Sequence, residues 1–249
     1  MKIQLIRSAT LKLFYSDLTI LIDPCLATKH SRPSYAGNSK NPLVDLPFGT
    51  DEIISDVDLV LISHLHSDHF DPSARELLPK MIEVICQPGD ENEIAASGFE
   101  KITPITTSIN RNGIRITQTA CQHGEGEVLN EMGTAIGFLI EAQNEPTIYW
   151  VGDTILTDAV INIATTRDPD VIVTHSCGAK WGDGVLIVMD DEQTIEMCKL
   201  NSKSTIIATH MESFDHSTVS RARLREYANK NGISDKKLLI PLDGEIVDM

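Results

Sequence analysis

An apolar stretch that runs directly into clustered histidines is the feature that most constrains this chain. Residues 58–63 read Asp-Leu-Val-Leu-Ile-Ser, and the next six positions contain His64, His66, Asp68 and His69. Apolar residues on both faces are typical of a strand buried in a sheet that helices cover. Because functional side chains gather where the strands of such sheets end, the segment predicts an α/β fold with a site at one sheet edge.

Strand-like and helix-like patterns follow one another in two rounds along the chain. We expect strands at 2–8, 11–17, 18–24, 58–63, 81–87, 100–105, 133–142, 146–153, 170–176 and 204–210. We expect helices at 71–80, 90–98, 157–166, 189–201 and 217–232. No linker separates the rounds, so the pattern predicts one α/β domain over residues 1–249, with two mixed sheets packed together and helices outside.

Three connecting segments carry their own signals. Asn112-Gly113, between two alternating runs in residues 107–120, is a strong hairpin signal. Residues 237–249 also read as a hairpin that closes the chain. Residues 24–50 are rich in proline and glycine, and an irregular segment of this length is usually functional.

Composition narrows the functional classes. The 36 acidic and 21 basic residues give a formal charge of -15, which argues against nucleic acid as a partner. A small anionic substrate stays open because bound metal ions can reverse the local field. The five cysteines are widely spaced without a Cys-x-x-Cys pair, so a disulfide scaffold or a zinc ribbon is not expected. No apolar run reaches the roughly 18 residues that span a bilayer, and we expect a cytoplasmic protein that does not contact membranes.

Further residues able to bind metal follow other strand-like runs, namely His123, Asp153 and His210. Imidazole and carboxylate ligands suit Zn²⁺, Mn²⁺ or Fe²⁺. Two residues apart on an extended segment, His64 and His66 project to the same side and can bind one ion, whereas residues 68–69 lie where the chain bends and can reach a second. The pattern predicts two divalent ions roughly 3.5–4 Å apart with a bridging carboxylate. The seven predicted ligands are His64, His66, Asp68, His69, His123, Asp153 and His210.

The run His64-Leu65-His66-Ser67-Asp68-His69 resembles the H-x-H-x-D-H signature of the metallo-β-lactamase superfamily, and the later histidine, aspartate and histidine follow in that family's order. The resemblance covers nearly the whole chain and implies a four-layer αββα sandwich. It also implies one ion held by His64, His66 and His123, and another held by Asp68, His69 and His210, with Asp153 as the bridge.

Within that superfamily, the chain is similar to the branch of bacterial metal-dependent hydrolases that includes L-ascorbate-6-phosphate lactonase. The stretches that carry this likeness are LIDPCLA, NPLVDLP, CQHGEGEVLNEMG, GDTILTD and HMESFDH. The chain departs from the branch at Arg7-Ser8, where many members have Gly-His or Gly-Asn. It also departs at His175 and Cys177, where small apolar residues and glycine are expected.

These features predict a metal-dependent hydrolase. A water on two metal ions loses its proton near neutral pH, and the dinuclear metal-bound hydroxide then attacks a small ester, lactone or phosphoester. Asp68 is the predicted catalytic residue that orients the hydroxide and carries the proton to the leaving group. His216, in the stretch HMESFDH, or His175 is predicted to stabilise the developing anion together with the metal ions.

Two alternatives stay open. The chain could bind metal without hydrolytic turnover. It could also hold a di-iron redox centre, although 249 residues leave no room for the flavin domain that such proteins use. The expected partner is a small molecule, and residues 24–50 could form a subunit contact in a homo-oligomer. For His175 and Cys177, the pattern favours a place in the pocket and a place in the core equally.

Overall fold

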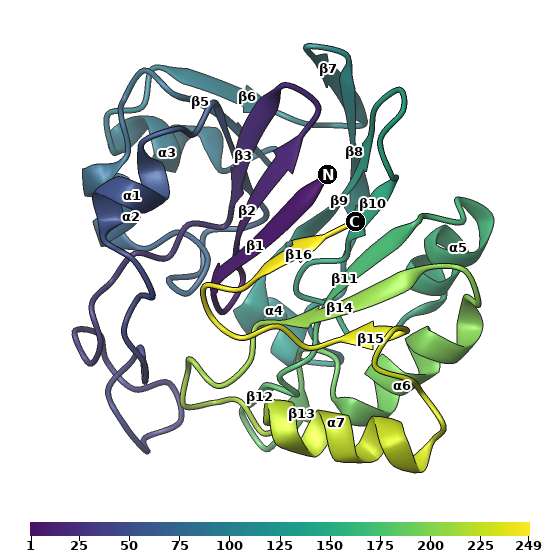
Figure 1. The fold of residues 1–249 in the computed structure, drawn as a ribbon. Coiled ribbons are helices and arrows are strands. Elements are labelled where there is room, and N and C mark those ends of the chain that lie inside the picture. The colour runs from purple at the N-terminus through teal and green to yellow at the C-terminus, as the bar shows by residue number, and fades with distance from the viewer.

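The computed structural model describes all 249 residues, and most of their strands form two seven-stranded sheets (Figure 1). In the first sheet, strands β3 to β6 run parallel, and β16, β1 and β2 complete one edge in antiparallel register. In order across the sheet, its strands are β16 (Ile246–Asp248), β1 (Lys2–Arg7), β2 (Thr10–Tyr15), β3 (Leu18–Ile22), β4 (Leu59–Ile62), β5 (Glu83–Cys86) and β6 (Lys101–Pro104).

The second sheet repeats this mixed arrangement. Strands β15, β14, β11 and β10 run parallel, and β9, β8 and β7 extend the sheet in antiparallel register. In order, its strands are β15 (Leu238–Leu239), β14 (Thr205–Thr209), β11 (Val171–His175), β10 (Ile148–Trp150), β9 (Ile136–Glu141), β8 (Ile114–Ala120) and β7 (Ser108–Arg111).

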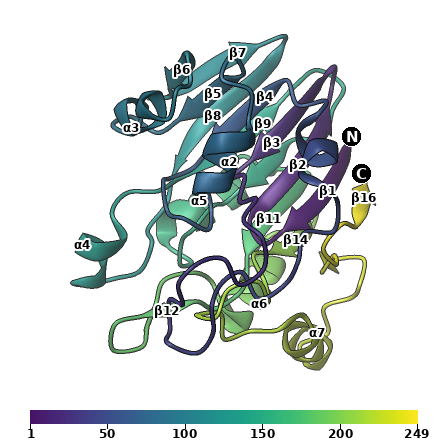
Figure 2. The same cartoon turned by 90° about the vertical axis from the view of Figure 1, so that its left-hand side faces the viewer.

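Helices cover the outer face of each sheet (Figures 1 and 2). The first sheet shares an apolar cluster with α1 (Thr50–Ile54), α2 (Pro72–Leu77) and α3 (Glu91–Ala96). The second shares one with α5 (Asp158–Thr166), α6 (Asp191–Leu200) and α7 (Arg221–Lys230). The layers are therefore helices, sheet, sheet and helices, which confirms the predicted αββα sandwich. None of the helices combines the length and the hydrophobicity that crossing a membrane requires.

The largest apolar cluster lies between the two sheets and joins residues from both. Phe138 and Trp150, both fully buried, pack there with ring centroids 5.7 Å apart. The Trp150 and His175 rings also form a T-shaped pair, with centroids 4.8 Å apart. Because interiors are close-packed, this core fixes where the side chains at the adjacent strand ends lie.

The structure confirms one predicted hairpin and contradicts the other. Strands β7 and β8 pair across Asn112 (φ 49°) and Gly113 (φ 82°), the two left-handed positions that a type I′ turn needs. The closing segment 237–249 is not a hairpin: β15 pairs with β14 in one sheet and β16 with β1 in the other. Each half of the segment thereby covers an open sheet edge, whose backbone groups a local hairpin would have left exposed.

One end of the molecule carries the long connections. The segment after β3, up to α1, contains no helix or strand apart from one backbone bridge between Arg32 and Asn41. Figures 1 and 2 both show this segment at the same end as the small sheet of β12 (Lys180–Trp181) and β13 (Val185–Leu186). The short helix α4 (Val128–Met132) shares an apolar cluster with this small sheet. These short elements were not predicted.

Candidate active site

Five strands deliver side chains to one edge of the sandwich. His64 follows β4, His123 follows β8, Asp153 follows β10, His210 follows β14, and His175 is the last residue of β11. All five are buried. The carboxyl ends of the strands converge as the sequence predicted.

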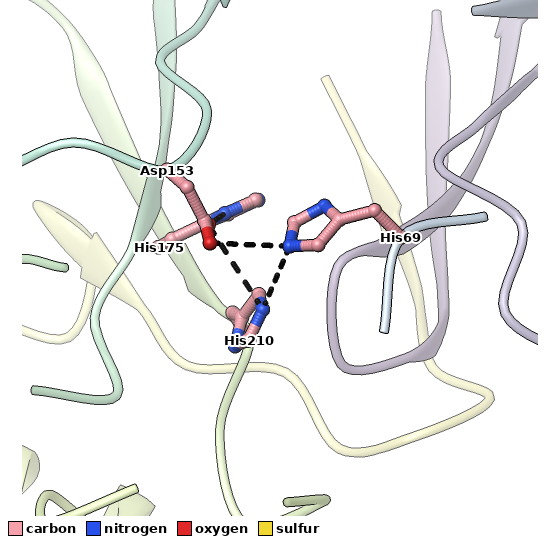
Figure 3. A group of neighbouring side chains, drawn as sticks. All are labelled: His69, Asp153, His175 and His210. Atoms are coloured by element: carbon pink, nitrogen blue, oxygen red, sulfur yellow. Dashed lines mark hydrogen bonds and ion pairs between the residues drawn. The ribbon is translucent and has the colours of Figure 1, made fainter. Parts of the chain in front are cut away.

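The candidate ligand atoms lie within 4.8 Å of one another in three groups; two of them hold the converging side chains, and the third, Asp23, His64 and His69, shares one histidine with each of these two. The first group is His64, His66 and His123, and the second is His69, Asp153, His175 and His210. Figure 3 shows His69, Asp153 and His210 pointing toward a common point. The Asp153 Oδ2 atom lies 3.2 Å from His69 Nε2 and 3.3 Å from His123 Nε2, so this carboxylate stands between the two groups.

The two predicted catalytic residues lie beside the second group. The Asp68 Oδ2 atom is 3.4 Å from His210 Nε2, 4.0 Å from His69 Nε2 and 3.9 Å from His216 Nε2. His175, which the sequence left undecided, is in the second group itself, where its Nδ1 atom lies 2.5 Å from Asp153 Oδ1. The structure thus brings every predicted site residue together and adds His175.

Hydrogen-bond partners outside the first and second groups orient the imidazoles. They lie next to the Nδ1 atoms of four histidines. In metal sites such partners fix the tautomer and the direction of the ring. The partners are Ser63 Oγ for His64 (2.9 Å), Asp23 Oδ2 for His69 (2.6 Å), the Ile187 carbonyl for His123 (2.8 Å) and Cys177 Sγ for His210 (3.4 Å).

An unpartnered atom shows that these residues fit a metal ion. The Nε2 atom of His64 is fully buried and has no hydrogen-bond partner, although it lies in a group of three imidazoles. A buried polar atom without a partner is costly, and a bound cation would supply the missing interaction. Imidazole and carboxylate donors without a thiolate suit borderline divalent ions.

Asp23 is a site residue that the sequence reasoning missed. Its buried carboxylate accepts hydrogen bonds from the Ser63 backbone N–H (2.8 Å), the Ser63 hydroxyl (2.6 Å) and His69 Nδ1 (2.6 Å). It therefore orients His69 directly and His64 through Ser63. Its φ of 46° is unusual for a residue other than glycine, and such strain concentrates at functional sites. In the sequence, an aspartate before Pro24 at the end of an expected strand looks like an ordinary turn residue.

The pKa shifts differ from one histidine to the next, and burial lowers the pKa of His175, in the second group, to about 4. Burial, and after it the neighbouring His69, lower the pKa of His64 well below its usual value, and burial lowers the pKa of His66. Neutral imidazole is the form that binds a metal ion. In the second group, burial acts to lower the pKa of His69, but Asp153 and Asp23 outweigh it and raise that pKa to about 10. Burial acts to raise the pKa of Asp153, but the adjacent His69 and His210 hold it well below its usual range.

A cavity of about 190 Å³ opens against this cluster. Beyond the cluster residues, its wall consists mainly of Tyr35, Met132, Trp181 and Ile187, together with Glu131. Trp181 Nε1 donates to Glu131 Oε2 at 2.8 Å. No lysine or arginine lines the cavity. The cavity is therefore small, partly apolar and without a fixed positive side chain.

The comparisons with known proteins agree with this architecture. A family model described as "Beta-lactamase superfamily domain" matches residues 19–211. Together, the packed sheets, the histidine and aspartate cluster and this match define a metal-dependent domain of the β-lactamase superfamily. The UPF0173 protein YddR of Bacillus subtilis (strain 168) is 36% identical over 251 residues, which cover 98% of each chain. The chain belongs to the UPF0173 family of metal-dependent hydrolases.

Two further relatives extend the comparison. A UPF0173 metal-dependent hydrolase of Methanosphaera stadtmanae is 27% identical over 237 residues, or 84% of this chain and 94% of the relative. The crystal structure of an isothiocyanate hydrolase from Delia radicum gut bacteria has a TM-score of 0.95 and 33% identity, covering 100% of this chain and 99% of that one. The narrower likeness to L-ascorbate-6-phosphate lactonase stays a prediction.

Proposed function

We propose that this chain hydrolyses small, neutral, carbon-centred electrophiles, foremost isothiocyanates, at a centre of two divalent metal ions. The observation that carries the proposal is the cavity: the two ligand groups adjoin it, and the rest of its wall is partly apolar and lacks lysine and arginine.

The size and the lining of the cavity select the substrate class. About 190 Å³ is less than the roughly 300–1,000 Å³ of sites for drug-sized ligands, which favours a substrate of few atoms. Phosphate groups are usually held by arginine or lysine, and here the charged residue in the wall outside the cluster is Glu131. A neutral isothiocyanate, lactone or ester suits this lining better than a phosphoester.

The likeness to the isothiocyanate hydrolase ranks the neutral candidates. That protein shares 33% of its sequence with this chain and aligns along its whole length. An isothiocyanate is a linear N=C=S group on an organic substituent, so the apolar wall of Met132, Trp181 and Ile187 suits the substituent while the reacting carbon faces the cluster.

In this proposal, His64, His66 and His123 would hold one ion and His69, His210 and Asp68 the other, with Asp153 between them. Bound divalent ions lower the pKa of a water from 15.7 to about 7 and polarise an electrophile. Asp68 faces the cavity, and His69 and a hydrogen bond from His210 hold its pKa well below its usual range against burial, which acts to raise it. Its carboxylate therefore stays ionised, and its position in the cavity wall is what suits it to take up a proton from the attacking water and pass it on.

The proton that Asp68 accepts is needed at the leaving atom. Hydrolysis of an isothiocyanate joins the water oxygen to the central carbon, breaks the C–N bond and places both water protons on nitrogen, giving an amine and carbonyl sulfide. His216, whose Nε2 atom is 3.9 Å from Asp68 Oδ2, lines the same cavity and can donate a hydrogen bond to the developing anion.

The test is turnover of a matched panel by protein stripped of metal and reloaded with Zn²⁺ or Mn²⁺. The panel contains benzyl isothiocyanate, δ-valerolactone, p-nitrophenyl acetate and bis-p-nitrophenyl phosphate. We expect metal-dependent release of benzylamine, weaker lactone or ester cleavage, and no phosphodiester cleavage. Preferred cleavage of the phosphodiester, or no turnover of any compound by metal-loaded protein, would contradict the proposal.

Substitutions tie the activity to the cluster. We expect Asp68→Asn to lower kcat by about 10²–10⁴, the usual contribution of a general acid or base. His66→Asn should abolish activity by removing a ligand. His30→Asn is the matched control, because His30 is exposed outside the cavity and its φ of 57° is one that asparagine tolerates. Equal losses of activity in His66→Asn and His30→Asn would show that the activity does not depend on this site.

A further inference from the structure

Residues 32–41, which we refer to as the strap, form a closed loop beside the cavity. The Arg32 N–H donates to the Asn41 carbonyl at 2.8 Å, and the Asn41 N–H donates to the Arg32 carbonyl at 3.0 Å. Between these two residues the chain has no helix or strand. A compact loop whose ends are this close is an Ω-type loop, and such loops are frequently functional.

The carboxylate of Asp215 accepts hydrogen bonds from much of the strap. Asp215 lies between the predicted catalytic residue His216 and Phe214, on the segment that follows His210. Its side chain accepts hydrogen bonds from six donors of the strap. They are the Ser34 hydroxyl, the backbone N–H groups of Tyr35 (2.9 Å), Ala36 (3.3 Å), Asn38 (3.1 Å) and Ser39 (3.2 Å), and Asn41 Nδ2 (2.9 Å).

Arg7 separately binds both ends of the connection between β3 and α1, which contains the strap. Its buried guanidinium donates to the carbonyls of Cys25 (3.1 Å) and Ala27 (2.9 Å) on one side and of Val44 (3.1 Å) on the other. Arg7 does not line the cavity. This side chain, one of the departures from the branch pattern in the sequence, therefore joins the two ends of the connection that carries the strap.

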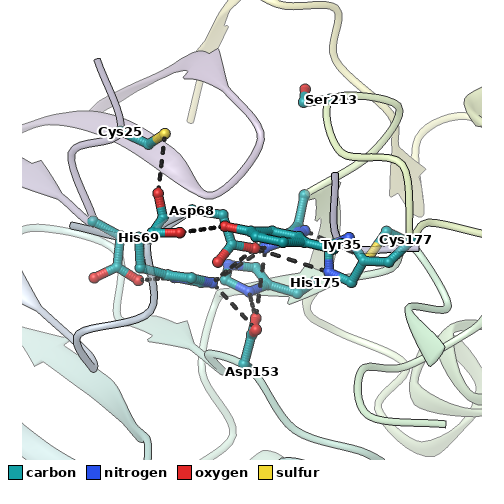
Figure 4. A network of polar contacts seen from close by, with 12 residues as sticks. Cys25, Tyr35, Asp68, His69, Asp153, His175, Cys177 and Ser213 are labelled. Atoms are coloured by element: carbon teal, nitrogen blue, oxygen red, sulfur yellow. Dashed lines mark hydrogen bonds and ion pairs between the residues drawn. The ribbon is translucent and has the colours of Figure 1, made fainter. Parts of the chain in front are cut away.

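Tyr35 is the residue of the strap that lines the cavity. Its ring stacks on Phe214 (centroids 5.7 Å apart, planes at 9°) and meets the His216 ring edge-on (5.1 Å, 86°). Its hydroxyl is hydrogen-bonded to Ser67, inside the histidine-rich run. Figure 4 shows the side chain reaching in among Asp68 and the histidines of the cluster. The aromatic ring is thus placed beside the groups proposed to act on the substrate.

We infer that Tyr35 is a specificity-determining residue that packs against the organic substituent of the substrate, and that Asp215 is the positioning residue that holds it there. The inference rests on the proposed function, because it assigns the substituent of that substrate to one wall of the cavity. Aromatic faces bind apolar and aromatic groups through both buried area and ring geometry. The same short segment supplies His210, Asp215 and His216, so the wall and the reacting groups are positioned together.

The test compares two substrates that differ only in their substituent. For Tyr35→Ala we expect KM for benzyl isothiocyanate to rise about 10-fold, because an aromatic contact and its buried area are lost. KM for methyl isothiocyanate should change by less than about 2-fold, because the methyl group reaches no such contact. Tyr35→Phe keeps the ring and should restore the wild-type ratio of the two KM values. Equal KM changes for both substrates in Tyr35→Ala would overturn the specificity role.

The positioning role of Asp215 is tested by measurements that do not depend on enzymatic turnover. In Asp215→Asn we expect amide protection factors of residues 35–39 to fall about 10-fold, because charge-assisted hydrogen bonds are replaced by weaker ones. The metal content should equal that of the wild type. The matched control is Asp235→Asn, since that carboxylate is 82% exposed and pairs with Arg225 away from the strap. Unchanged protection in Asp215→Asn would overturn the positioning role.

A failure of the proposed function has a different signature. If wild-type metal-loaded protein hydrolyses no isothiocyanate, that function is wrong, and the wall is then tested by NMR titration with benzamide. Weaker benzamide binding in Tyr35→Ala than in Tyr35→Phe would support an aryl-binding wall. Equal binding in both variants would overturn it.

Discussion

Removing the Asp23 carboxylate tests how far the site depends on a residue that does not line the cavity. The Asp23→Ala change leaves three buried donors without their acceptor: the Ser63 backbone N–H, the Ser63 hydroxyl and His69 Nδ1. Each unsatisfied donor costs about 1–3 kcal/mol. Part of this is offset because a buried charge is also removed, so we expect a loss of about 3–5 kcal/mol, the usual range for breaking a buried charged pair.

The same change should weaken metal binding. Partners behind metal ligands typically contribute about 10–100-fold in affinity, and Asp23 orients His69 directly and His64 through Ser63. We would measure unfolding of the metal-free protein in urea, and Zn²⁺ affinity by competition with a chromophoric chelator.

Asp191→Ala is the control for this experiment. Asp191 is also buried and pairs with Arg223, but on α6 away from the histidines. It should lower stability and leave Zn²⁺ affinity unchanged. The reasoning is refuted if Asp23→Ala binds Zn²⁺ within about 2-fold of wild type, since a partner behind a ligand should contribute more, or if Asp191→Ala weakens binding equally.

The strap and the core each give a further prediction. Burial acts to raise the pKa of Asp215, but hydrogen bonds from Ser34, Asn41 and the strap backbone hold it well below its usual range. Its contribution is therefore fully present above the unfolded pKa of about 3.9 and is lost as the pH falls below that value. Amide protection factors of the strap should stay constant between pH 8 and 5 and fall at lower pH. A fall that already occurs between pH 7 and 5 would show that a group other than Asp215 holds the strap in place. Phe138→Ala, at a fully buried site against Trp150, should lower the free energy of unfolding by about 3–5 kcal/mol in urea titrations. A loss below about 1 kcal/mol would show that the two sheets do not share this core.

Local patterns predicted much of the fold and the cluster. The spacing of His64, His66, Asp68 and His69 after a buried strand placed the site at a sheet edge, and Asn112-Gly113 specified its hairpin through backbone conformations that few other residues adopt. Both signals are contained within a few residues, so a single sequence reveals them.

Long-range partners could not be predicted in the same way. Asp23 and His69 are 46 positions apart, and Asp215 and Ser34 are 181 apart, so neither pair leaves a local pattern. The closing segment 237–249 was misread for a related reason. Its two halves pair with strands of different sheets, and only the packed sandwich determines which edges are open.

Anomalous diffraction at the zinc edge, from crystals of protein stripped of metal and reloaded with Zn²⁺, tests the central claim most directly. We predict two peaks inside the cluster, one among His64, His66 and His123 and one beside His69 and His210, with Asp153 between them. In crystals of His66→Asn, the first peak should lose most of its occupancy. Zinc bound only at surface residues, with no peak inside the cluster of the wild-type protein, would contradict the assignment of this site as a metal-dependent hydrolytic centre.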